Sequence, residues 1–359
     1  MSLVRLKKEL KLNSKPLKST LNHFILMRYI RQEIFSEIGK KGQQKLRKSN
    51  VAIVGIGALG SNTAELLARA GVGKLILVDR DVVELSNLQR QRLFDENDIG
   101  KPKALAAKEH LNKINSEVGI ISMIDDLNHE NTDKNLNGKV DLILDCTDNL
   151  ETRFLINDFC IKNKIPFIYS SAVGSKGYVF DIVPNKTACL RCFLKEAGQL
   201  DTCETRGVLN AITALISSIQ VNESIKILLQ KDHEKSLLFF DVWKNELLKI
   251  KVSKNKSCIC CAKNNFEYLS GKKSPRIVKL CGDNIYQIRK KSIDKNEFTN
   301  LKNKLEKIGK VTDFDYCISF DNRLTVFNDG SVLVKAKGEK EAKSVYSRFV
   351  GNRSEDSRL

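Results

Sequence analysis

Three glycines and an aspartate in the first third of the chain have the types and the spacing that bind a nucleotide. Gly55, Gly57 and Gly60 follow GxGxxG spacing directly after the apolar run at residues 51–54. Asp79 lies about 20 residues further on, where a carboxylate hydrogen-bonds a ribose hydroxyl. Glycines let the backbone approach a phosphate closely. Taken alone, the pattern favours a nicotinamide-dependent oxidoreductase over other users of nucleotides.

A second group of polar side chains follows this unit and fits the chemistry of a nucleoside triphosphate. Its members are Ser86, Asn87, Gln89, Arg90 and Lys103. When a carboxylate attacks the α-phosphate of ATP, the departing pyrophosphate gathers negative charge that fixed cations must balance. We expect Arg90 and Lys103 to supply these cations, and Asn87 to contact a phosphate or a metal-bound water. The alternative for these residues is a charged loop and helix surface.

Two aspartates follow the apolar run at residues 140–144, which predicts a strand. Ligands of an open α/β sheet bind beyond the carboxyl ends of its strands. A carboxylate placed there can hold Mg²⁺ against the phosphates of ATP, because this hard cation prefers oxygen ligands. Asp145 and Asp148 are the candidates.

Two CxxC pairs indicate a metal site. They are Cys189 with Cys192 and Cys258 with Cys261. Each pair can occupy two adjacent positions of a tetrahedral Zn²⁺, for which thiolates are suitable ligands. The long gap between the pairs is unusual for a compact zinc finger, so spacing alone leaves unrelated thiols as an equal alternative.

Together these motifs resemble the adenylating domain of ThiF and MoeB, relatives of the ubiquitin-activating enzymes. The resemblance rests on SNLQRQ at 86–91, the second lysine of KPKA (Lys103) and DCTDN at 145–149, in the order that the family has them. It spans roughly residues 27–261. Proteins of that family use ATP and Mg²⁺ to adenylate the C-terminal glycine of small ubiquitin-like sulfur carriers. The resemblance therefore implies a carrier with a Gly-Gly C-terminus as the partner.

The resemblance also implies roles for single residues. Asp148 is the metal-linked aspartate, and Asp145 is left with a structural role. Arg31 matches the arginine of an RYxRQ arm that reaches the nucleotide phosphates of the partner subunit, which implies a homodimer. Without the resemblance, a solvated helix face is the better interpretation of Arg31. The implied nucleotide-binding residues are Gly55, Gly57, Ala58, Gly60, Asp79, Ser86, Asn87, Gln89, Arg90, Lys103, Asp148 and Asn149.

The same resemblance implies that Cys189, Cys192, Cys258 and Cys261 close one structural Zn²⁺, with Cys260 a spare thiol. Cys203 is the candidate for covalent catalysis, since a cysteine here can form a thioester or an acyl disulfide with the activated carrier. A helix N-terminus and Arg206 would favour its thiolate. A dispensable loop cysteine is an equal alternative. The chain departs from the family at Ala58, a glycine elsewhere, and at Asn210-Ala211, where many relatives have Gly-Pro.

The composition and the charge of the chain bear on its expected partners and location. The 359 residues carry a formal net charge of +18, which would attract nucleic acid or ATP. The charges are spread along the chain, so solvated surface lysines are the favoured explanation and nucleic acid is not an expected partner. Charges interrupt the N-terminus where a signal peptide would need an apolar core, and polar residues interrupt the apolar stretch at 207–230. We expect a cytoplasmic protein that binds no membrane, with 207–230 as a buried helix.

The elements that position these residues are expected to form an α/β fold. It is a Rossmann-like sheet with a parallel nucleotide-binding half and a zinc-pinned C-terminal lobe, plus a small α+β domain. A flexible basic arm at 1–20 precedes the adenylation domain at 21–263, which starts with an amphipathic helix at 21–38. Residues 276–350 form the small α+β domain, and 351–359 a polar tail.

The predicted function is ATP-dependent adenylylation of the C-terminal glycine of a ubiquitin-like sulfur carrier. No rhodanese-like domain is apparent, so sulfur is expected from a separate donor protein. Carriers of thiamine synthesis, molybdopterin synthesis and tRNA thiolation all fit. One alternative is a related enzyme that activates a carboxylate on tRNA with the same chemistry. The other is an NAD-dependent oxidoreductase, which would share the glycines and Asp79 but would ignore ATP.

Overall fold

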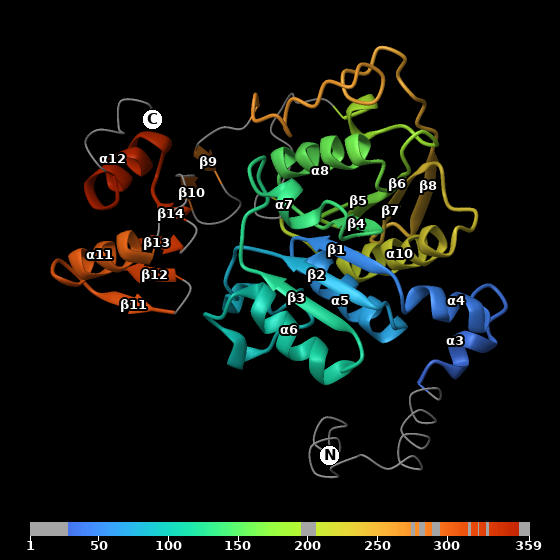
Figure 1. Ribbon diagram of the computed structural model, residues 1–359, viewed down its shortest axis with the longest axis horizontal. Coiled ribbons are helices and arrows are strands. Elements are labelled where there is room, and N and C mark those ends of the chain that lie inside the picture. The colour runs from blue at the N-terminus through green and yellow to red at the C-terminus, as the bar shows by residue number, and fades with distance from the viewer. Residues whose placement is uncertain are drawn as a thin grey trace, which may run out of the picture. The chain divides into compact units, whose positions relative to one another are not determined.

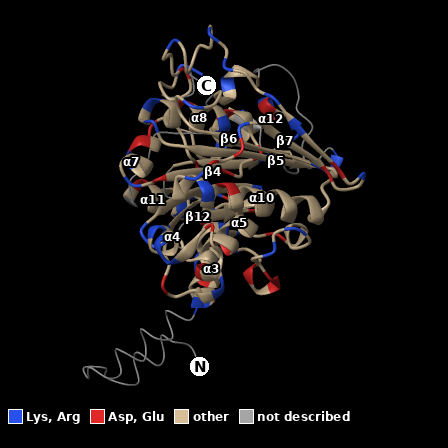
Figure 2. Ribbon diagram, turned by 90° about the vertical axis from the view of Figure 1, so that its right-hand side faces the viewer, with Lys and Arg blue, Asp and Glu red and all other residues tan. Residues whose placement is uncertain are grey.

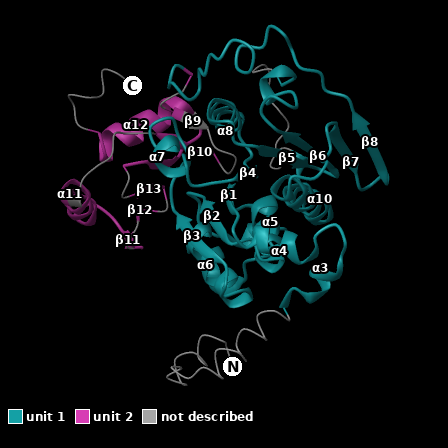
Figure 3. Cartoon of the chain, turned by 45° about the vertical axis from the view of Figure 1, so that its right-hand side comes forward, with its two compact units in different colours: residues 1–272 teal, residues 273–359 magenta. Residues whose placement is uncertain are grey.

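The chain folds into two compact units, which Figure 3 colours separately. Unit 1 comprises residues 1–272 and unit 2 residues 273–359. The computed structural model describes residues 28–194, 206–273, 277–279, 284–288, 295–314, 317–321, 323–327 and 330–351.

An eight-stranded sheet forms the centre of unit 1 (Figure 1), in the order β3-β2-β1-β4-β5-β6-β7-β8. The first five strands in this order pair parallel, and β5 through β8 pair antiparallel. The strands are β1 Asn50–Val54, β2 Lys74–Val78, β3 Gly119–Met123, β4 Leu142–Asp145, β5 Phe167–Val173, β6 Lys176–Ile182, β7 Leu237–Asp241 and β8 Glu246–Ile250.

The strand order puts a reversal between β1 and β4. The chain runs from β1 outward through β2 and β3, and then returns to the other side of β1, where Val54 pairs with Asp145. Ligands of open parallel sheets bind beyond the carboxyl ends of the strands at such a reversal. Gly55, Asp79 and Asp148 all follow strands at this edge.

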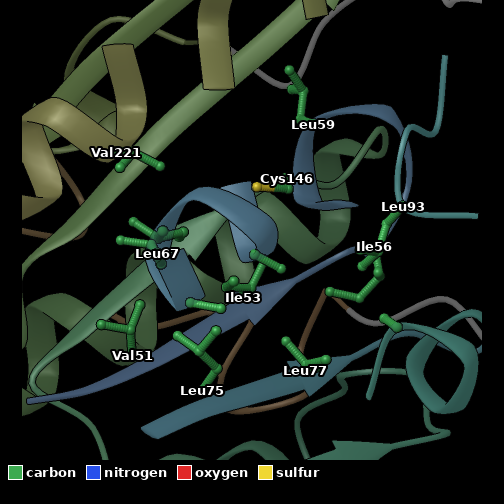
Figure 4. Close-up of a cluster of buried hydrophobic side chains, with 14 of the residues drawn as sticks. Val51, Ile53, Ile56, Leu59, Leu67, Leu75, Leu77, Leu93, Cys146 and Val221 are labelled. Carbon is green, nitrogen blue, oxygen red and sulfur yellow. The ribbon is translucent and has the colours of Figure 1, made fainter. Parts of the chain in front are cut away.

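Helices cover both faces of this sheet. Side chains alternate along β1, so that Val51 and Ile53 join one core and Ala52 and Val54 the other. The first core, drawn in Figure 4, includes residues of α5, α6 and α10, and the second includes residues of α7 and α8. The helices of unit 1 that bear on the site are α3 Ile30–Ile34, α4 Gly39–Leu46, α5 Ala58–Ala70, α6 Lys103–Ile114, α7 Thr132–Leu136, α8 Leu150–Asn163 and α10 Asn210–Leu229.

Among the described helices, α10 alone is long and apolar enough to cross a membrane by length and composition. Half of its apolar window is buried inside the protein, where it packs against α5, β5 and β6. Its buried polar side chains Ser217, Gln220 and Glu223 form hydrogen bonds with other parts of unit 1. In this structure α10 serves as a core helix, as we expected for residues 207–230.

Unit 2 has a six-stranded antiparallel sheet in the order β11-β12-β13-β14-β10-β9. It has its own hydrophobic core, in which Leu305 and Tyr346 of its two helices meet Ile318, Val326 and Val334. Its elements are β9 Ile277–Lys279, β10 Ile285–Ile288, α11 Lys295–Glu306, β11 Val311–Asp313, β12 Cys317–Phe320, β13 Leu324–Phe327, β14 Val332–Lys335 and α12 Glu339–Phe349.

The predicted fold class is confirmed: a mostly parallel α/β sheet, a second small antiparallel sheet, and a cysteine cluster able to bind metal. The helix predicted to continue to residue 38 is wrong, because α3 ends at Ile34 and Phe35 has an extended backbone. A separate helix, α4, begins at Gly39, whose φ of +61° breaks a continuous helix. Figure 2 shows basic and acidic residues interspersed over the described elements.

Candidate active site

The turn from β1 into the start of α5, residues 55–60, is called the glycine turn here and requires glycine at two positions. Gly55 has a φ of +87°, and a Cβ there would lie 2.7 Å from the carbonyl oxygen of Cys146. A Cβ on Gly60 would lie 1.8 Å from the carbonyl oxygen of Gly55. Gly57 is the N-cap residue of α5 and supplies no side-chain acceptor to the helix, whose first residue is Ala58. The first N–H groups of α5 therefore suit an anionic ligand.

Asp79, at the end of β2, braces this turn. Its Oδ2 accepts a hydrogen bond from the backbone N–H of Ile56 at 2.5 Å, and its Oδ1 accepts one from that of Asp81 at 2.7 Å. Burial and the charge of Asp81 raise the pKa of Asp79 to about 6, against the opposing effect of Lys103 and the two backbone donors. Each carboxylate oxygen has a second lone pair, so the group can still accept a ribose hydroxyl.

Ion pairs with at least one buried or half-buried partner lie beside Asp79. Lys103 is the first residue of α6 and only 7% exposed, and its Nζ lies 3.0 Å from Asp81 Oδ2. Arg80 Nη1 lies 2.7 Å from Asp126 Oδ1, and its Nε lies 3.7 Å from Asp81 Oδ1. Burial opposes the charged form of Lys103, but the carboxylates of Asp81 and Asp79 outweigh it and raise the pKa of the lysine. The lysine is therefore held as a cation beside the glycine turn.

Asp148 is exposed, and within the part of the chain that the structure describes it forms no hydrogen bond or ion pair. Its charge acts on Lys103: burial lowers the pKa of that lysine, whereas Asp81, Asp79 and, most weakly, Asp148 raise it. The structure thus brings Asp79, Lys103 and Asp148 into one electrostatic neighbourhood at the carboxyl edge of the sheet.

Two residues hold the loop that carries Asp148. Asp145 is fully buried, and its Oδ1 accepts hydrogen bonds from the N–H and the hydroxyl of Thr147, at 3.0 and 2.7 Å. Arg153, on α8, donates to the carbonyl oxygen of Thr147 and lies 3.6 Å from Asp145 Oδ2. Asn149 caps α8, since its side chain accepts from the N–H of Thr152 at 2.8 Å. The predicted structural role of Asp145 agrees with these bonds.

The segment at residues 84–90 forms a turn with its own hydrogen bonds. Buried Asn87 accepts through Oδ1 from the N–H of Glu84 at 3.2 Å, and Arg90 Nη1 donates to the carbonyl oxygen of Ser86 at 2.8 Å. Ser86 and Gln89 are exposed. Asn87 therefore shapes the turn, while Arg90 is anchored by a single neutral acceptor.

Gln91 was not among the predicted site residues, although it belongs to the same motif. It is 3% exposed, its Oε1 has no hydrogen-bond partner among the described residues, and a Cβ on Gly57 would lie 3.9 Å from its Nε2. Its side chain places the motif directly against the glycine turn. Arg80, Asp81 and Arg153 were missed as well, because only the folded chain shows which charges surround Lys103 and the Asp148 loop.

Arg31 lies away from this cluster. The ring of Tyr29 fills the space beside Gly71, where a Cβ would come within 2.4 Å of it, and Gln32 Nε2 donates to the carbonyl oxygen of Ala70 at 2.9 Å. These contacts fix the segment around Arg31 at the C-terminal end of α5. The 13 residues of this helix place that end about 20 Å from the glycine turn. Arg31 is exposed and has no ion-pair partner among the described residues.

The four predicted metal ligands converge. The Sγ atoms of Cys189 and Cys192 are 3.8 Å apart, those of Cys189 and Cys258 3.6 Å, and those of Cys192 and Cys261 3.5 Å. A tetrahedral Zn²⁺ with Zn–S bonds of ~2.3 Å requires S–S edges of ~3.8 Å. The donors and their spacing therefore fit zinc. Cys260 lies outside this group of four, although its thiol also contacts that of Cys189, and its Sγ accepts from Asn157 Nδ2 at 3.2 Å.

Cys203, the predicted candidate for covalent catalysis, lies outside the described residues. Arg206, three residues later, is exposed.

Known proteins resemble this chain over most of its length. The model of the ThiF family matches residues 29–260. The sulfur carrier protein ThiS adenylyltransferase of Bacillus subtilis is 38% identical over 335 residues, covering 90% of this chain and 99% of that protein. The adenylyltransferase and sulfurtransferase MOCS3 of Culex quinquefasciatus is 37% identical over 250 residues, which are 68% of this chain and 57% of that protein.

A solved structure agrees in fold. The crystal structure of E. coli MccB with ATP superimposes with a TM-score of 0.55 at 23% identity, over 61% of this chain and 68% of that one. The resemblance inferred from the motifs is thus confirmed by the family model, the relatives and the fold. This chain belongs to the ThiF family.

Proposed function

We propose that this protein transfers AMP from ATP to the C-terminal glycine of a ubiquitin-like sulfur carrier. A carboxylate oxygen of the glycine attacks the α-phosphorus, the bond to the bridging oxygen of the β-phosphate breaks, and pyrophosphate leaves with the electron pair. The products are the carrier acyl-adenylate and pyrophosphate. The observation that carries the proposal is the placement of Asp79, Lys103 and Asp148 at the carboxyl edge of the sheet, where Asp79 bonds Ile56 of the glycine turn, in a chain that aligns with 99% of a ThiS adenylyltransferase.

Different residues of the chain contact the phosphates and the ribose of ATP in this proposal. Backbone N–H groups at the start of α5 face the phosphates, and Asp79 accepts a ribose hydroxyl while holding the turn through Ile56. Lys103, kept charged by its carboxylate neighbours, balances the charge that develops on the pyrophosphate. Arg90 needs to give up only one neutral acceptor, the carbonyl oxygen of Ser86, to join it.

Mg²⁺ fits the free carboxylate of Asp148. Oxygen ligands suit this cation, which keeps several waters and binds through one or two carboxylates plus substrate phosphates. When bound, it supplies charge neutralisation at the phosphates. The chain contributes the loop geometry, set by Asp145, Thr147 and Arg153, in which the carboxylate of Asp148 is exposed.

Arg31 acts in a partner subunit in this proposal, and the protein is a homodimer. The supporting observation is the arm's attachment to the far end of α5, because an arginine about 20 Å from its own glycine turn cannot reach its own phosphates. The exposed apolar side chains of Ile30, Ile34 and Phe35 flank Arg31 on the same arm. A second copy of the chain would cover them as it receives the arginine.

Zn²⁺ bound by the four cysteines has a structural role. Four protein ligands leave no open position for chemistry. The metal would tie the segment after β6 to the segment after β8, since Cys189 and Cys258 are 69 positions apart in the sequence.

ATP–pyrophosphate exchange tests the proposal. Purified protein is incubated with ATP, Mg²⁺ and labelled pyrophosphate, together with carriers ending in Gly-Gly, with the same carriers lacking the last glycine, or with tRNA. Exchange that requires a carrier with an intact C-terminus supports the proposal. Exchange driven only by tRNA, or thermal stabilisation by NAD and not by ATP, would overturn it. A separate protein is expected to donate sulfur to the acyl-adenylate.

A further inference from the structure

One buried side chain, that of Gln220, connects the helix after the glycine turn with the strand end before the Asp148 loop. Gln220 lies in the middle of α10 and has no exposed surface. Its amide contacts α5, the end of β4 and β5. We propose that Gln220 is a positioning residue that sets the spacing between the glycine turn and the Asp148 loop, and so the geometry in which ATP and Mg²⁺ are held. The inference rests on the ATP site of the proposed function.

The oxygen of the amide serves the helix that begins at the glycine turn. Gln220 Oε1 accepts a hydrogen bond from the hydroxyl of Thr63, on α5, at 2.9 Å. One turn earlier on α10, the hydroxyl of Ser217 donates to the carbonyl oxygen of Leu59, in the first turn of α5, at 3.0 Å. Two side chains of α10 therefore hold the first turns of α5, and both hydrogen bonds are buried.

The nitrogen of the amide serves the strand ends. Gln220 Nε2 lies 3.3 Å from the carbonyl oxygen of Asp145 and 3.1 Å from the hydroxyl of Ser170, which itself donates to that carbonyl at 2.7 Å. The thiol of Cys146 donates to Gln220 Oε1 at 3.3 Å. The carbonyl and the thiol belong to the two residues that open the loop to Asp148. Figure 4 shows Cys146 next to α5.

The amide of glutamine carries both an acceptor and a donor, so it can bond both sides. Thr63 and Cys146 are donors and need an acceptor, whereas the carbonyl of Asp145 needs a donor. A carboxylate would accept on one side and leave the carbonyl facing another acceptor. A methionine side chain of similar length would do neither. The bonds cross from the β1 half of the site to the β4 half, at the strand-order reversal where the two halves must hold one ligand.

The variant Gln220→Met keeps an unbranched side chain of similar size and removes the amide. The matched control is Ser224→Ala, one turn further along α10, because the hydroxyl of Ser224 is equally buried but donates only to the backbone carbonyl of Gln220 within the helix. Both variants lose buried hydrogen bonds of the same helix, but only the first loses contacts to α5 and β4. The measurement is the affinity for a non-hydrolysable ATP analogue, titrated with Mg²⁺ and again with chelator, together with the thermal unfolding midpoint.

We expect Gln220→Met to weaken binding of the analogue with Mg²⁺ about tenfold, and Ser224→Ala to weaken it less than about twofold. In the background of Asp148→Ala, Gln220→Met should cause no further loss, because the two changes act on the same contact. Equal affinities of Gln220→Met and wild type, equal losses in Gln220→Met and the control, or additive losses with Asp148→Ala would overturn the inference.

If Gln220→Met fails to fold, Thr63→Val replaces it, because valine matches threonine in shape and lacks the hydroxyl that donates to Gln220 Oε1. The same weakening of Mg²⁺-dependent binding is expected, and wild-type affinity in this variant would overturn the inference. Binding of the analogue needs no carrier. A wild-type protein that binds ATP but shows no carrier-dependent exchange would therefore contradict the proposed function and leave the role of Gln220 measurable.

Discussion

Lys103 Nζ lies 3.0 Å from Asp81 Oδ2, and the lysine side chain is buried while the aspartate is partly exposed. A buried ammonium without a partner would lose its charge or destabilise the fold. The ion pair keeps Lys103 charged before ATP binds. Its partner Asp81 is partly exposed, so a phosphate can take the place of this carboxylate beside the lysine. In the proposed reaction the charge of Lys103 would balance that of the departing pyrophosphate, and the fold holds it in place.

Replacing Lys103 with methionine removes this charge and should lower carrier-dependent exchange by about 10²-fold or more, since one preorganised charge at a transition state contributes on that scale. Lys101→Met is the matched control. Lys101 is partly exposed and pairs with Asp98 at 3.1 Å, so its loss should change exchange less than about twofold. Comparable rates for the two variants would remove Lys103 from the site.

Arg31 can be tested by mixing two inactive variants. Arg31→Ala and Lys103→Met are unfolded together and refolded, so that mixed dimers form. If Arg31 acts on the partner's phosphates, each mixed dimer has one intact site, and exchange should recover to about a quarter of the wild-type rate. If Arg31 acted on its own site, every site would carry one defect and no recovery would occur. Sedimentation of each variant alone checks that both remain dimers.

Asp148→Ala should abolish pyrophosphate release at ordinary Mg²⁺ concentrations, because the loop would lose the exposed carboxylate that we propose binds Mg²⁺. Asp145→Asn provides the contrast. Asp145 is fully buried and bonds Thr147, so its change should lower the unfolding temperature as well as the exchange rate. Asp148 is exposed, and its variant should unfold like wild type. Normal turnover by Asp148→Ala would contradict a role in metal binding.

One zinc per chain is expected by elemental analysis of protein purified without chelator. Cys258→Ser should lose the metal and about 3 kcal/mol of stability, a drop of roughly 10 °C in the unfolding midpoint. Cys260→Ser is the control, because Cys260 bonds Asn157 and lies outside the four-sulfur cluster. It should retain its zinc. Loss of zinc in both variants, or in neither, would refute the assignment of ligands.

Asp181 should make a contribution to stability that is lost as the pH rises from about 4 to about 8. Burial raises the pKa of Asp181 to about 7, against the opposing effect of His233, whose Nδ1 lies 3.3 Å away, while Glu223 adds to the rise. A carboxyl whose pKa is raised on folding binds its proton more tightly in the folded state. Its contribution is therefore fully present below pH ~4 and is lost through pH ~7.

The histidine acts in the same direction. Its close contact with the carboxyl group of Asp181 raises the pKa of His233, so this contribution is also lost as the pH rises. In Asp181→Asn the free energy of unfolding, measured by urea at pH 5 and pH 8, should fall less between the two than in wild type. An equal fall in both proteins would show that the pair does not titrate in this range.

The sequence by itself determined the nucleotide turn, the fold class and the family, because these depend on local patterns. Glycine spacing after an apolar run specifies a strand-turn-helix unit, and the continuous apolar run of β1 specifies a strand buried on both faces. The two CxxC pairs pointed to the four cysteines whose sulfurs converge, but their spacing could not show that sulfurs 69 residues apart lie 3.6 Å from each other.

Only the tertiary structure decided which charges and amides support the site. Asp81, Arg153 and Gln220 carry no signal in their own sequence neighbourhoods, because what they do depends on partners far along the chain. Gln220 meets Thr63 across 157 residues and Asp145 across 75. Such contacts arise where the strand order reverses and α10 packs over both halves of the sheet. A local pattern specifies an element, whereas the sharing of one buried amide between three elements depends on how the whole chain packs.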